Sequence, residues 1–293
     1  TERQMTMQKI DYNSPAALKK FLAERGMAMQ KKFGQNFLVN ERARQTLADS
    51  LALEDGMTAW EIGPGVGAMT AELLKKGAAL TVFEIDRGFA LILREFFEDT
   101  GDNFKIVEGD VLKTWKGEVK SKGIPKRVFG NLPYNIAAAF IADTIEKGVR
   151  FEKAVFTVQK EVAERMCAKA GSADYSSFSV LCQWAYDVKP VLDLAGGNFW
   201  PRPNVASRSV VMKKKADFPR CKNPERFIKM QRVLFSSRRK TVYNNLTRFT
   251  GNADTAISAL QASGIEPMTR AERLPLEKLL ELSDHLNTDI LPT

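Results

Sequence analysis

The alternation of strand-like and helix-like segments between residues 58 and 158 constrains the fold of this chain more than any other feature. Five short runs rich in β-branched and aromatic residues recur there, and helical periodicity lies between most of them. The runs are TAWEIG (58–63), LTVFEID (80–86), FKIVEGD (104–110), RVFGNL (127–132) and KAVFTV (153–158). Such alternation predicts an α/β fold in which a mainly parallel sheet carries helices on both faces and binds ligands beyond the carboxyl ends of its strands.

The flanking segments add elements to this fold. Residues 16–25 and 41–53 have the spacing and end signals of helices. Two apolar stretches, 184–194 and 207–213, are expected to complete a seven-stranded sheet as a hairpin. Beyond Lys215 the apolar spacing becomes helical, which predicts a small all-helical C-terminal domain. The predicted organisation is an N-terminal extension over residues 1–30, an α/β domain over 31–215 and a helical domain over 216–293.

The composition excludes several classes of enzyme. A single histidine, His285, leaves almost no material for a Ser-His-Asp triad, a Cys-His pair or a histidine metal site, so we expect no metal. Cys167, Cys182 and Cys221 form no C-x-x-C pattern, which is typical of reduced thiols in a cytoplasmic protein. There is no apolar run of the roughly 18 residues that a membrane helix needs, and no apolar stretch of a signal peptide. We therefore expect a cytoplasmic protein that does not bind a membrane.

The net charge of +9 is unevenly distributed along the chain. Residues 36–212 have 22 basic and 23 acidic side chains (−1), whereas residues 213–250 have 12 and 2 (+10). Residues 1–35 carry +4 and residues 251–293 carry −4. The two basic segments predict a polyanionic partner. A solvated surface is the simpler interpretation of such clusters.

A glycine-rich turn follows the first of the five strands. In EIGPGVG the glycines stand at positions 63, 65 and 67, directly before a helical pattern. Glycine lets a ligand approach the backbone, and a helix N-terminus presents free N–H groups. Glu84, at the end of the next strand, is placed to accept hydrogen bonds from ribose hydroxyls, so an adenosine-containing cofactor is expected. Asp110, where an adenine amino group would donate, favours S-adenosylmethionine over NAD, although it also fits a helix N-cap.

The fourth strand ends in Asn131-Leu132-Pro133-Tyr134. An adenine amino group is a poor nucleophile because its lone pair is delocalised into the ring. The Asn131 side-chain carbonyl and the Leu132 backbone carbonyl would accept its two N–H bonds, localise the lone pair and aim it at a sulfonium methyl, which is catalysis by positioning. Pro133 would fix the turn, and Tyr134 would offer a stacking face for a base.

These residues resemble a known family. The shared motifs are GQNFL (34–38), EIGPGVGAMT (61–70), FEID (83–86), GD (109–110), NLPYN (131–135), QKEVAERM (159–166), NFWPRPNVASRSVV (198–211) and SRRKTVYNNL (237–246). Together they are similar to the small-subunit ribosomal RNA adenine dimethyltransferases of the kasugamycin-sensitivity type. The resemblance implies a Rossmann-like methyltransferase that uses S-adenosylmethionine, forms S-adenosylhomocysteine and dimethylates two adjacent adenosines near the 3′ end of 16S rRNA. It also implies a role in small-subunit biogenesis, with the small ribosomal subunit or its precursor as partner, and we expect a monomer.

The resemblance assigns roles residue by residue. The cofactor contacts that it implies are Gln35, Asn36, Leu38, Gly63, Gly65, Glu84, Asp110 and Asn131. Asn131 to Tyr134 match the catalytic turn, and Phe199 matches an aromatic that stacks on a flipped-out adenine. Trp200 and Arg202 depart from the family pattern, so the stacking residue is either Phe199 or Trp200. We expect rRNA phosphates to be bound by Lys31, Lys32, Arg238, Arg239 and Lys240.

Three other functions are compatible with parts of the sequence. Large-subunit methyltransferases of the macrolide-resistance type share the fold and the turn, but SRRKTVYNNL resembles the small-subunit type. A ribosome-assembly factor would bind precursor particles without needing methyl transfer. DNA adenine methylation is disfavoured because DNA enzymes usually have a D/N-P-P-Y turn and a target-recognition insert.

Overall fold

The computed structural model describes residues 10–27, 35–132 and 134–286. They divide into two compact units. The α/β unit comprises the described residues of Thr1–Phe140, Phe151–Ala163 and Lys189–Lys213, and the helical unit comprises those of Ile141–Arg150, Glu164–Val188 and Lys214–Thr293. The domain boundary expected between residues 215 and 216 stays a prediction.

The main sheet has seven strands in the order β4-β3-β2-β5-β6-β9-β7. The strands are β2 (Thr58–Ile62), β3 (Ala79–Glu84), β4 (Phe104–Glu108), β5 (Arg127–Asn131), β6 (Lys153–Gln159), β7 (Tyr186–Leu194) and β9 (Ser207–Lys214). Strands β2 to β6 pair in parallel with one another, and β9 runs antiparallel to β6. The predicted α/β fold is therefore confirmed, and the two late apolar stretches are adjacent strands at one edge of the sheet.

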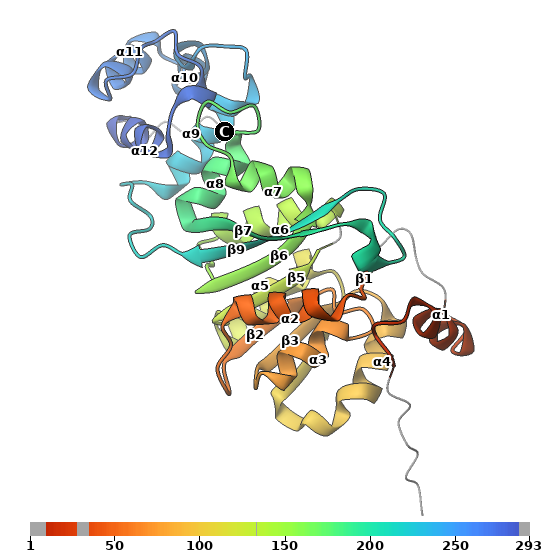
Figure 1. The fold of residues 1–293 in the computed structure, drawn as a ribbon. Helices are drawn as coiled ribbons and strands as arrows, with labels where there is room; N and C mark the ends of the chain where they lie inside the picture. Colours follow the sequence, from red (N-terminus) through yellow and green to blue (C-terminus); the bar gives the residue numbers. More distant parts are fainter. Residues whose placement is uncertain (1–9, 28–34, 133, 287–293) are drawn as a thin grey trace, which may run out of the picture. The chain divides into compact units, whose positions relative to one another are not determined.

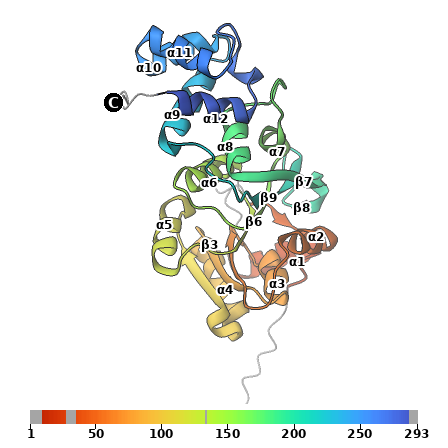
Figure 2. The same ribbon diagram turned by 90° about the vertical axis from the view of Figure 1, so that its left-hand side faces the viewer.

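Helices cover both faces of this sheet in the α/β unit (Figures 1 and 2). Figure 2 shows α5 on one side of β3 and both α2 and α3 on the other. The helices that begin in this unit are α1 (Pro15–Glu24), α2 (Glu41–Leu51), α3 (Ala68–Lys75), α4 (Arg87–Phe97), α5 (Val111–Lys122), α6 (Tyr134–Glu146) and α7 (Lys160–Cys167), with short 3₁₀ segments η2 (Glu98–Asn103) and η3 (Gly196–Asn198). Because both faces are covered, strands such as β5 and β6 are buried along almost their whole length.

Two very short strands were not predicted. Strand β1 (Phe37–Leu38) pairs antiparallel with β8 (Phe199–Trp200), which places Phe37 opposite Trp200 and Leu38 opposite Phe199. Two residues are too few for a period of two to be recognised in the sequence. This pairing joins the GQNFL segment to a segment more than 160 positions away in the chain.

The helical unit contains helices where helical spacing was predicted beyond Lys215, and two further helices, over 177–185 and 242–250, that were not predicted. The elements are α8 (Ser177–Ala185), α9 (Pro224–Ser236), α10 (Val242–Thr250), α11 (Ala253–Ala262) and α12 (Leu276–His285), with η4 (Ala271–Arg273). Helix α10 was overlooked because its sequence, VYNNLTRFT, has few strong helix formers, although Thr241 caps it. The core of the unit includes Trp184 packed against Phe227, with ring centroids 4.8 Å apart. No helix in the described ranges is both long enough and apolar enough to span a membrane.

Candidate active site

The glycine-rich turn forms the floor of the candidate site. Gly63, Gly65 and Gly67 all have positive φ angles (71°, 57° and 89°), which glycine adopts without strain, so the chain turns sharply from β2 into α3. A Cβ at Gly65 would lie 2.6 Å from the Phe37 ring. A Cβ at Gly63 would meet no atom nearer than 3.8 Å, because this glycine faces the open pocket. The turn therefore packs tightly on one side and leaves space for a ligand on the other.

Glu84 lies at the end of β3 and holds this turn. Its Oε2 accepts a hydrogen bond from the Gly65 backbone N–H (3.0 Å), and its Oε1 accepts one from the Asp86 N–H (2.8 Å). The side chain is 4% exposed, and burial raises the pKa of Glu84 to about 7, although the two backbone donors oppose this rise. The carboxylate is thus fixed in position and titrates in the physiological range.

Glu61 is a second buried carboxyl in the pocket, and the sequence analysis assigned it no role. It lies on β2, is 1% exposed and accepts a hydrogen bond from the Thr70 hydroxyl (2.7 Å). Burial, reinforced by the charge of Glu84, raises the pKa of Glu61 to about 8. An acidic residue inside an otherwise apolar, doubly covered strand is the signal that would have identified it.

Asp110 lies just after β4 and lines the same pocket. Its Oδ1 accepts a hydrogen bond from the Leu112 N–H (3.0 Å), so it is the N-cap of α5. The helix-cap interpretation is therefore correct. The two roles are compatible, because a carboxylate has two oxygens and the cap hydrogen bond uses one.

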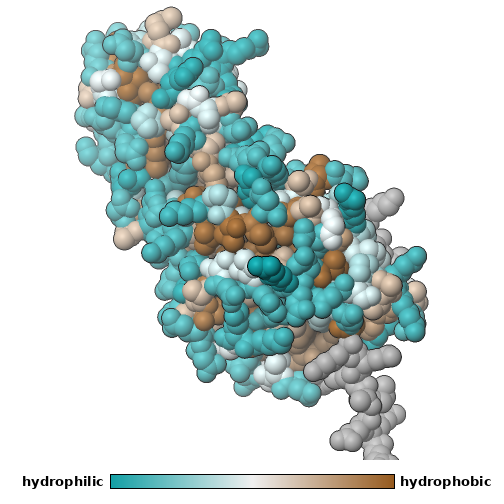
Figure 3. Space-filling model, in the orientation of Figure 1, coloured by the Kyte–Doolittle hydropathy of each residue, from teal (hydrophilic) through white to brown (hydrophobic). Residues whose placement is uncertain are grey.

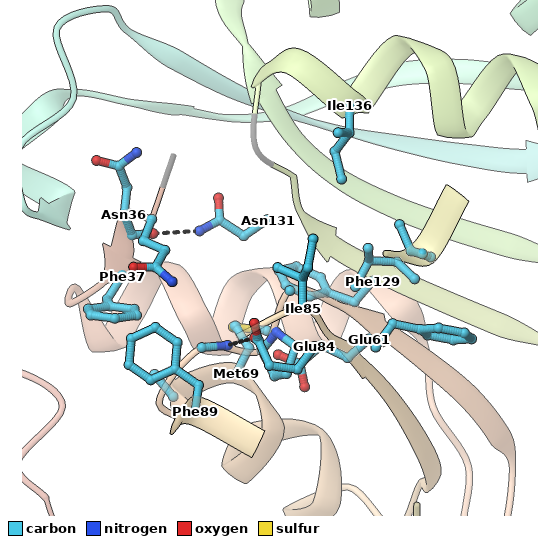
Figure 4. A pocket seen from close by; sticks show the side chains of 18 of the residues that line it. Asn36, Phe37, Glu61, Met69, Glu84, Ile85, Phe89, Phe129, Asn131 and Ile136 are labelled. Carbon is cyan, nitrogen blue, oxygen red and sulfur yellow. Dashed lines mark hydrogen bonds between the residues drawn. The ribbon is translucent and has the colours of Figure 1, made fainter. Parts of the chain in front are cut away.

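Asn131, the last residue of β5, is held in one orientation. Its Nδ2 donates to the backbone carbonyl of Asn36 (2.8 Å), as Figure 4 shows. A carbonyl can only accept, so the amide nitrogen must face it and Oδ1 must face away. Leu132 is 2% exposed, and its N–H donates to the Thr157 carbonyl of β6 (3.1 Å). Pro133 lies outside the described residues, and Tyr134 begins α6.

One cavity of about 300 Å³ collects most of the predicted cofactor residues (Figure 4). This cofactor pocket is lined by Gln35, Asn36, Gly63, Gly65, Glu84, Asp110 and Asn131, and also by residues that were not predicted, namely Phe37, Glu61, Met69, Ile85, Phe89, Phe129 and Ile136. Leu38 does not line it. Its side chain is 3% exposed in the main hydrophobic core, and its carbonyl accepts a hydrogen bond from the buried Arg44. All the lining residues belong to the α/β unit.

The two candidate stacking residues differ in burial. Phe199 is 5% exposed and packs in the main core with Leu38, so little of its ring is available to a base. Trp200 is half-buried, and its ring lies 6.2 Å from that of Phe37 at an angle of 31°. Phe37 in turn lines the cofactor pocket. Of the two residues, Trp200 therefore has the more accessible ring.

The predicted RNA contacts fall into three groups. Lys31 and Lys32 lie outside the described residues. Arg239 and Lys240 are exposed in the turn between α9 and α10. Arg238 pairs with Glu272 (3.0 Å) and donates to the Ala173 carbonyl (2.8 Å). Arg238 thus already has partners within the helical unit.

The doubly covered sheet and the pocket at the carboxyl ends of its parallel strands define a Rossmann-like fold. Two solved structures share this fold. A dimethyladenosine transferase from Plasmodium falciparum has a TM-score of 0.72 and 24% identity, covering 83% of this chain and 94% of that one. The 23S rRNA methyltransferase ErmE has a TM-score of 0.63 and 23% identity, covering 86% and 99%. At these identities the likeness shows the fold.

Sequence comparison gives the family. The model described as ribosomal RNA adenine dimethylase matches residues 26–288. A protein named ribosomal RNA small subunit methyltransferase A from Treponema denticola is 48% identical, covering 94% of this chain and 95% of its own. A protein of the same name from Borreliella burgdorferi is 41% identical, covering 95% and 96%. The chain therefore belongs to the ribosomal RNA adenine dimethylase family, which confirms the family and the class of enzyme predicted from its motifs.

Proposed function

We propose that this protein uses S-adenosylmethionine to dimethylate the amino groups of two adjacent adenosines near the 3′ end of small-subunit rRNA. The observation that carries the proposal is the orientation of Asn131. Because its Nδ2 is engaged by the Asn36 carbonyl, its Oδ1 is left to accept an N–H bond from the target amino group. The Asn36 carbonyl belongs to the segment that also supplies Phe37 to the cofactor pocket.

The pocket fits S-adenosylmethionine. The open space in front of Gly63 admits a ligand close to the backbone, Glu84 at the end of β3 would accept from the ribose hydroxyls, and Asp110 would accept from the adenine amino group. When bound, this cofactor supplies an electrophilic methyl group. The apolar side chains of Ile85 and Phe129 in the wall would exclude water from the adenosine.

The role of this chain in methyl transfer is to position and polarise the target. The Asn131 Oδ1 and the Leu132 carbonyl would each accept one hydrogen of the adenine amino group, which favours a pyramidal nitrogen with a directed lone pair. The N–H of Leu132 donates to the Thr157 carbonyl, which anchors Leu132 to the neighbouring strand. We assign base stacking to Trp200, because its ring is more exposed than that of Phe199. The side chain of Tyr134 lies outside the described part of the structure, so its stacking role stays a prediction from the motif.

The helical unit supplies charge for the substrate. Its segment 214–250 has 11 basic and 2 acidic side chains (+9), and the surface of α9 to α12 visible in Figure 3 is mostly hydrophilic. Exposed cations such as Arg239 and Lys240 suit phosphate contacts that depend on RNA shape. We propose that the substrate is the small ribosomal subunit or its precursor, and that the enzyme acts in the cytoplasm as a monomer.

The test is incubation with labelled S-adenosylmethionine and small subunits that lack the modification, followed by mapping of dimethyladenosine. We expect two adjacent labelled adenosines near the 3′ end of the small-subunit rRNA. Large subunits are the matched control substrate. Labelling confined to large subunits would overturn the choice of substrate, and binding to small subunits without any labelling would favour an assembly factor instead.

A further inference from the structure

Residues 10–27 have no role in the function proposed above. All but Gly26 and Met27 lie outside the matched family model, which begins at residue 26. The structure nevertheless packs them against the cofactor pocket. Helix α1 begins at a proline after the N-cap Ser14 and buries Leu18 (1% exposed) and Leu22 (3% exposed). We call residues 10–27 the N-terminal brace.

The brace shares a hydrophobic cluster with one wall of the cofactor pocket. The buried members of this cluster are Leu18, Leu22, Phe37, Val39, Val66, Phe89 and Ile92. Phe37 and Phe89 also line the pocket, and their rings meet edge to face at 5.5 Å. Figure 4 shows these two rings side by side at the pocket. The brace therefore packs behind the two rings that form the front of this wall.

A hydrogen bond connects the brace to the glycine-rich turn itself. The Tyr12 hydroxyl donates to the backbone carbonyl of Val66 (3.1 Å), the residue between Gly65 and Gly67. Burial raises the pKa of Tyr12, so its hydroxyl keeps its proton and remains a donor at every physiological pH. A turn made of glycines has many accessible backbone conformations, and a contact at its centre reduces their number.

Polar contacts fix the brace on both sides of that hydrogen bond. The buried Arg44 of α2 donates to the Asn13 Oδ1 (2.7 Å) and to the Leu38 carbonyl (2.9 Å), so one guanidinium joins the brace to β1. At the other end, Arg25 pairs with Glu95 of α4 (2.5 Å). The brace thus contacts α2 and α4, and Arg44 connects it to β1, which supplies Phe37 to the pocket.

We propose that the N-terminal brace is a positioning element for the cofactor, with Tyr12 as its positioning residue. It keeps the glycine-rich turn and the Phe37–Phe89 wall in the conformation that binds S-adenosylmethionine. Tyr12 acts through Val66 and does not touch the reacting atoms. The proposal rests on the function proposed above, because it concerns the same pocket.

The expected size of the effect follows from population arithmetic. If the turn adopts other conformations once Tyr12 is removed, the apparent Kd rises by the inverse of the fraction that remains competent. Loss of one buried hydrogen bond limits that change to between about twofold and about tenfold. The methyl-transfer step at saturating cofactor is expected to stay within about twofold, because the competent conformation itself is unchanged.

The first test measures S-adenosylhomocysteine binding and methylation kinetics with Tyr12→Phe in the full chain. We expect about fivefold weaker binding and a matching rise in KM for S-adenosylmethionine, with kcat nearly unchanged. Lys19→Ala, at an exposed position of α1, is the matched control and should bind as the wild type does. The proposal would be overturned if Tyr12→Phe bound S-adenosylhomocysteine with wild-type affinity. It would also be overturned if kcat fell about fivefold while KM for S-adenosylmethionine stayed unchanged.

The second test uses the reciprocity of coupled equilibria. If the brace favours cofactor binding, the cofactor must favour docking of the brace by the same factor. Backbone amides of α1 should therefore exchange hydrogen more slowly when S-adenosylhomocysteine is bound, whereas those of α12 should not change. Exchange in α1 that is insensitive to bound S-adenosylhomocysteine contradicts the proposal. A wild-type protein that does not bind S-adenosylhomocysteine at all would instead refute the proposed function, so the two failures are distinguishable.

Discussion

The two units of this protein use ionisable side chains in opposite ways. In the α/β unit the important carboxyls are few and buried, with Glu61 and Glu84 at 1% and 4% exposure, and burial shifts the pKa of both. In the helical unit many cations lie at the surface, and its segment 214–250 has 11 basic and 2 acidic side chains. Arg239 and Lys240 are typical of these exposed cations.

Under the proposed function, this difference separates chemistry from substrate binding along one chain. Methyl transfer needs a small number of groups held in place where the dielectric constant is low, because there each dipole acts strongly. Binding of a polyanion needs many exposed cations, whose joint effect is long-ranged and salt-dependent. Changes in the pocket should therefore affect catalysis, and changes in the basic turn should affect RNA affinity.

The strongest test of this separation is Asn131→Ala. The variant loses an acceptor that is aimed at the target amino group, so we expect methylation to fall by at least about a hundredfold. Binding of small subunits should be nearly unchanged, since the basic segment is intact. The measurements are a methylation time course and a subunit-binding assay.

The matched control for Asn131→Ala is Asn103→Ala, an exposed asparagine in η2. It should retain wild-type methylation. Wild-type methylation by Asn131→Ala itself would refute the role given to the catalytic turn, and a parallel loss of subunit binding would show that chemistry and binding are not separated.

Trp200→Ala tests whether the α/β unit also contacts the RNA base. A base stacked on an aromatic ring loses about 1–3 kcal/mol on alanine substitution, so kcat/KM for the subunit should fall about thirtyfold. Cofactor affinity should change less, because Trp200 does not line the cofactor pocket. Trp200→Phe retains a stacking face and should recover most of the activity. If it does not, Trp200 acts through its packing on Phe37 and the stacking assignment is wrong.

A double charge reversal in the basic turn, Arg239→Glu with Lys240→Glu, tests the other side of the comparison. We expect about tenfold weaker subunit binding and a salt dependence whose slope falls by about two, one for each phosphate that is no longer neutralised. Binding of S-adenosylhomocysteine should be unaffected. Reversal of Lys120 and Lys122, two exposed lysines of α5, gives the same change in net charge and serves as the control. Equal weakening by both pairs would mean that only the total charge matters.

The sequence predicts the sheet well because each buried parallel strand leaves a recognisable signal in its own short stretch of sequence. Strands covered on both faces appear as continuous apolar runs, and their carboxyl ends meet at one edge of the sheet. Glu84, Asp110 and Asn131 each follow such a run, so their convergence was expected. The structure brings all three into one pocket.

What the sequence did not reveal depends on long-range contacts. The pairing of β1 with β8 decides that Phe199 faces the main core while Trp200 packs, half-buried, against the smaller cluster that contains Phe37, since neighbouring residues of a strand point to opposite faces. A one-residue change of register would reverse this outcome, and nothing in the local sequence specifies the register. The contact of Tyr12 with Val66 spans 54 positions and leaves no local signal for the same reason.

The smallest expected effect concerns pH, and it concerns only the pocket. The pKa of Glu84 is raised from its ordinary 4.5 to about 7, and the ionised form is the better acceptor for ribose hydroxyls. Affinity for S-adenosylhomocysteine should therefore rise with pH, by at most about tenfold between pH about 6 and about 8.

The stability of the free protein should change in the opposite direction. A carboxyl whose pKa is raised on folding stabilises the fold below 4.5 and loses that contribution as pH rises through about 7. Glu84→Gln cannot ionise, so it should remove both trends, apart from the remaining contribution of Glu61 near pH 8. Calorimetric titration and thermal unfolding across this pH range measure the two trends separately. Affinity that falls with rising pH, or that keeps its full pH dependence in Glu84→Gln, would exclude Glu84 as the titrating ribose acceptor.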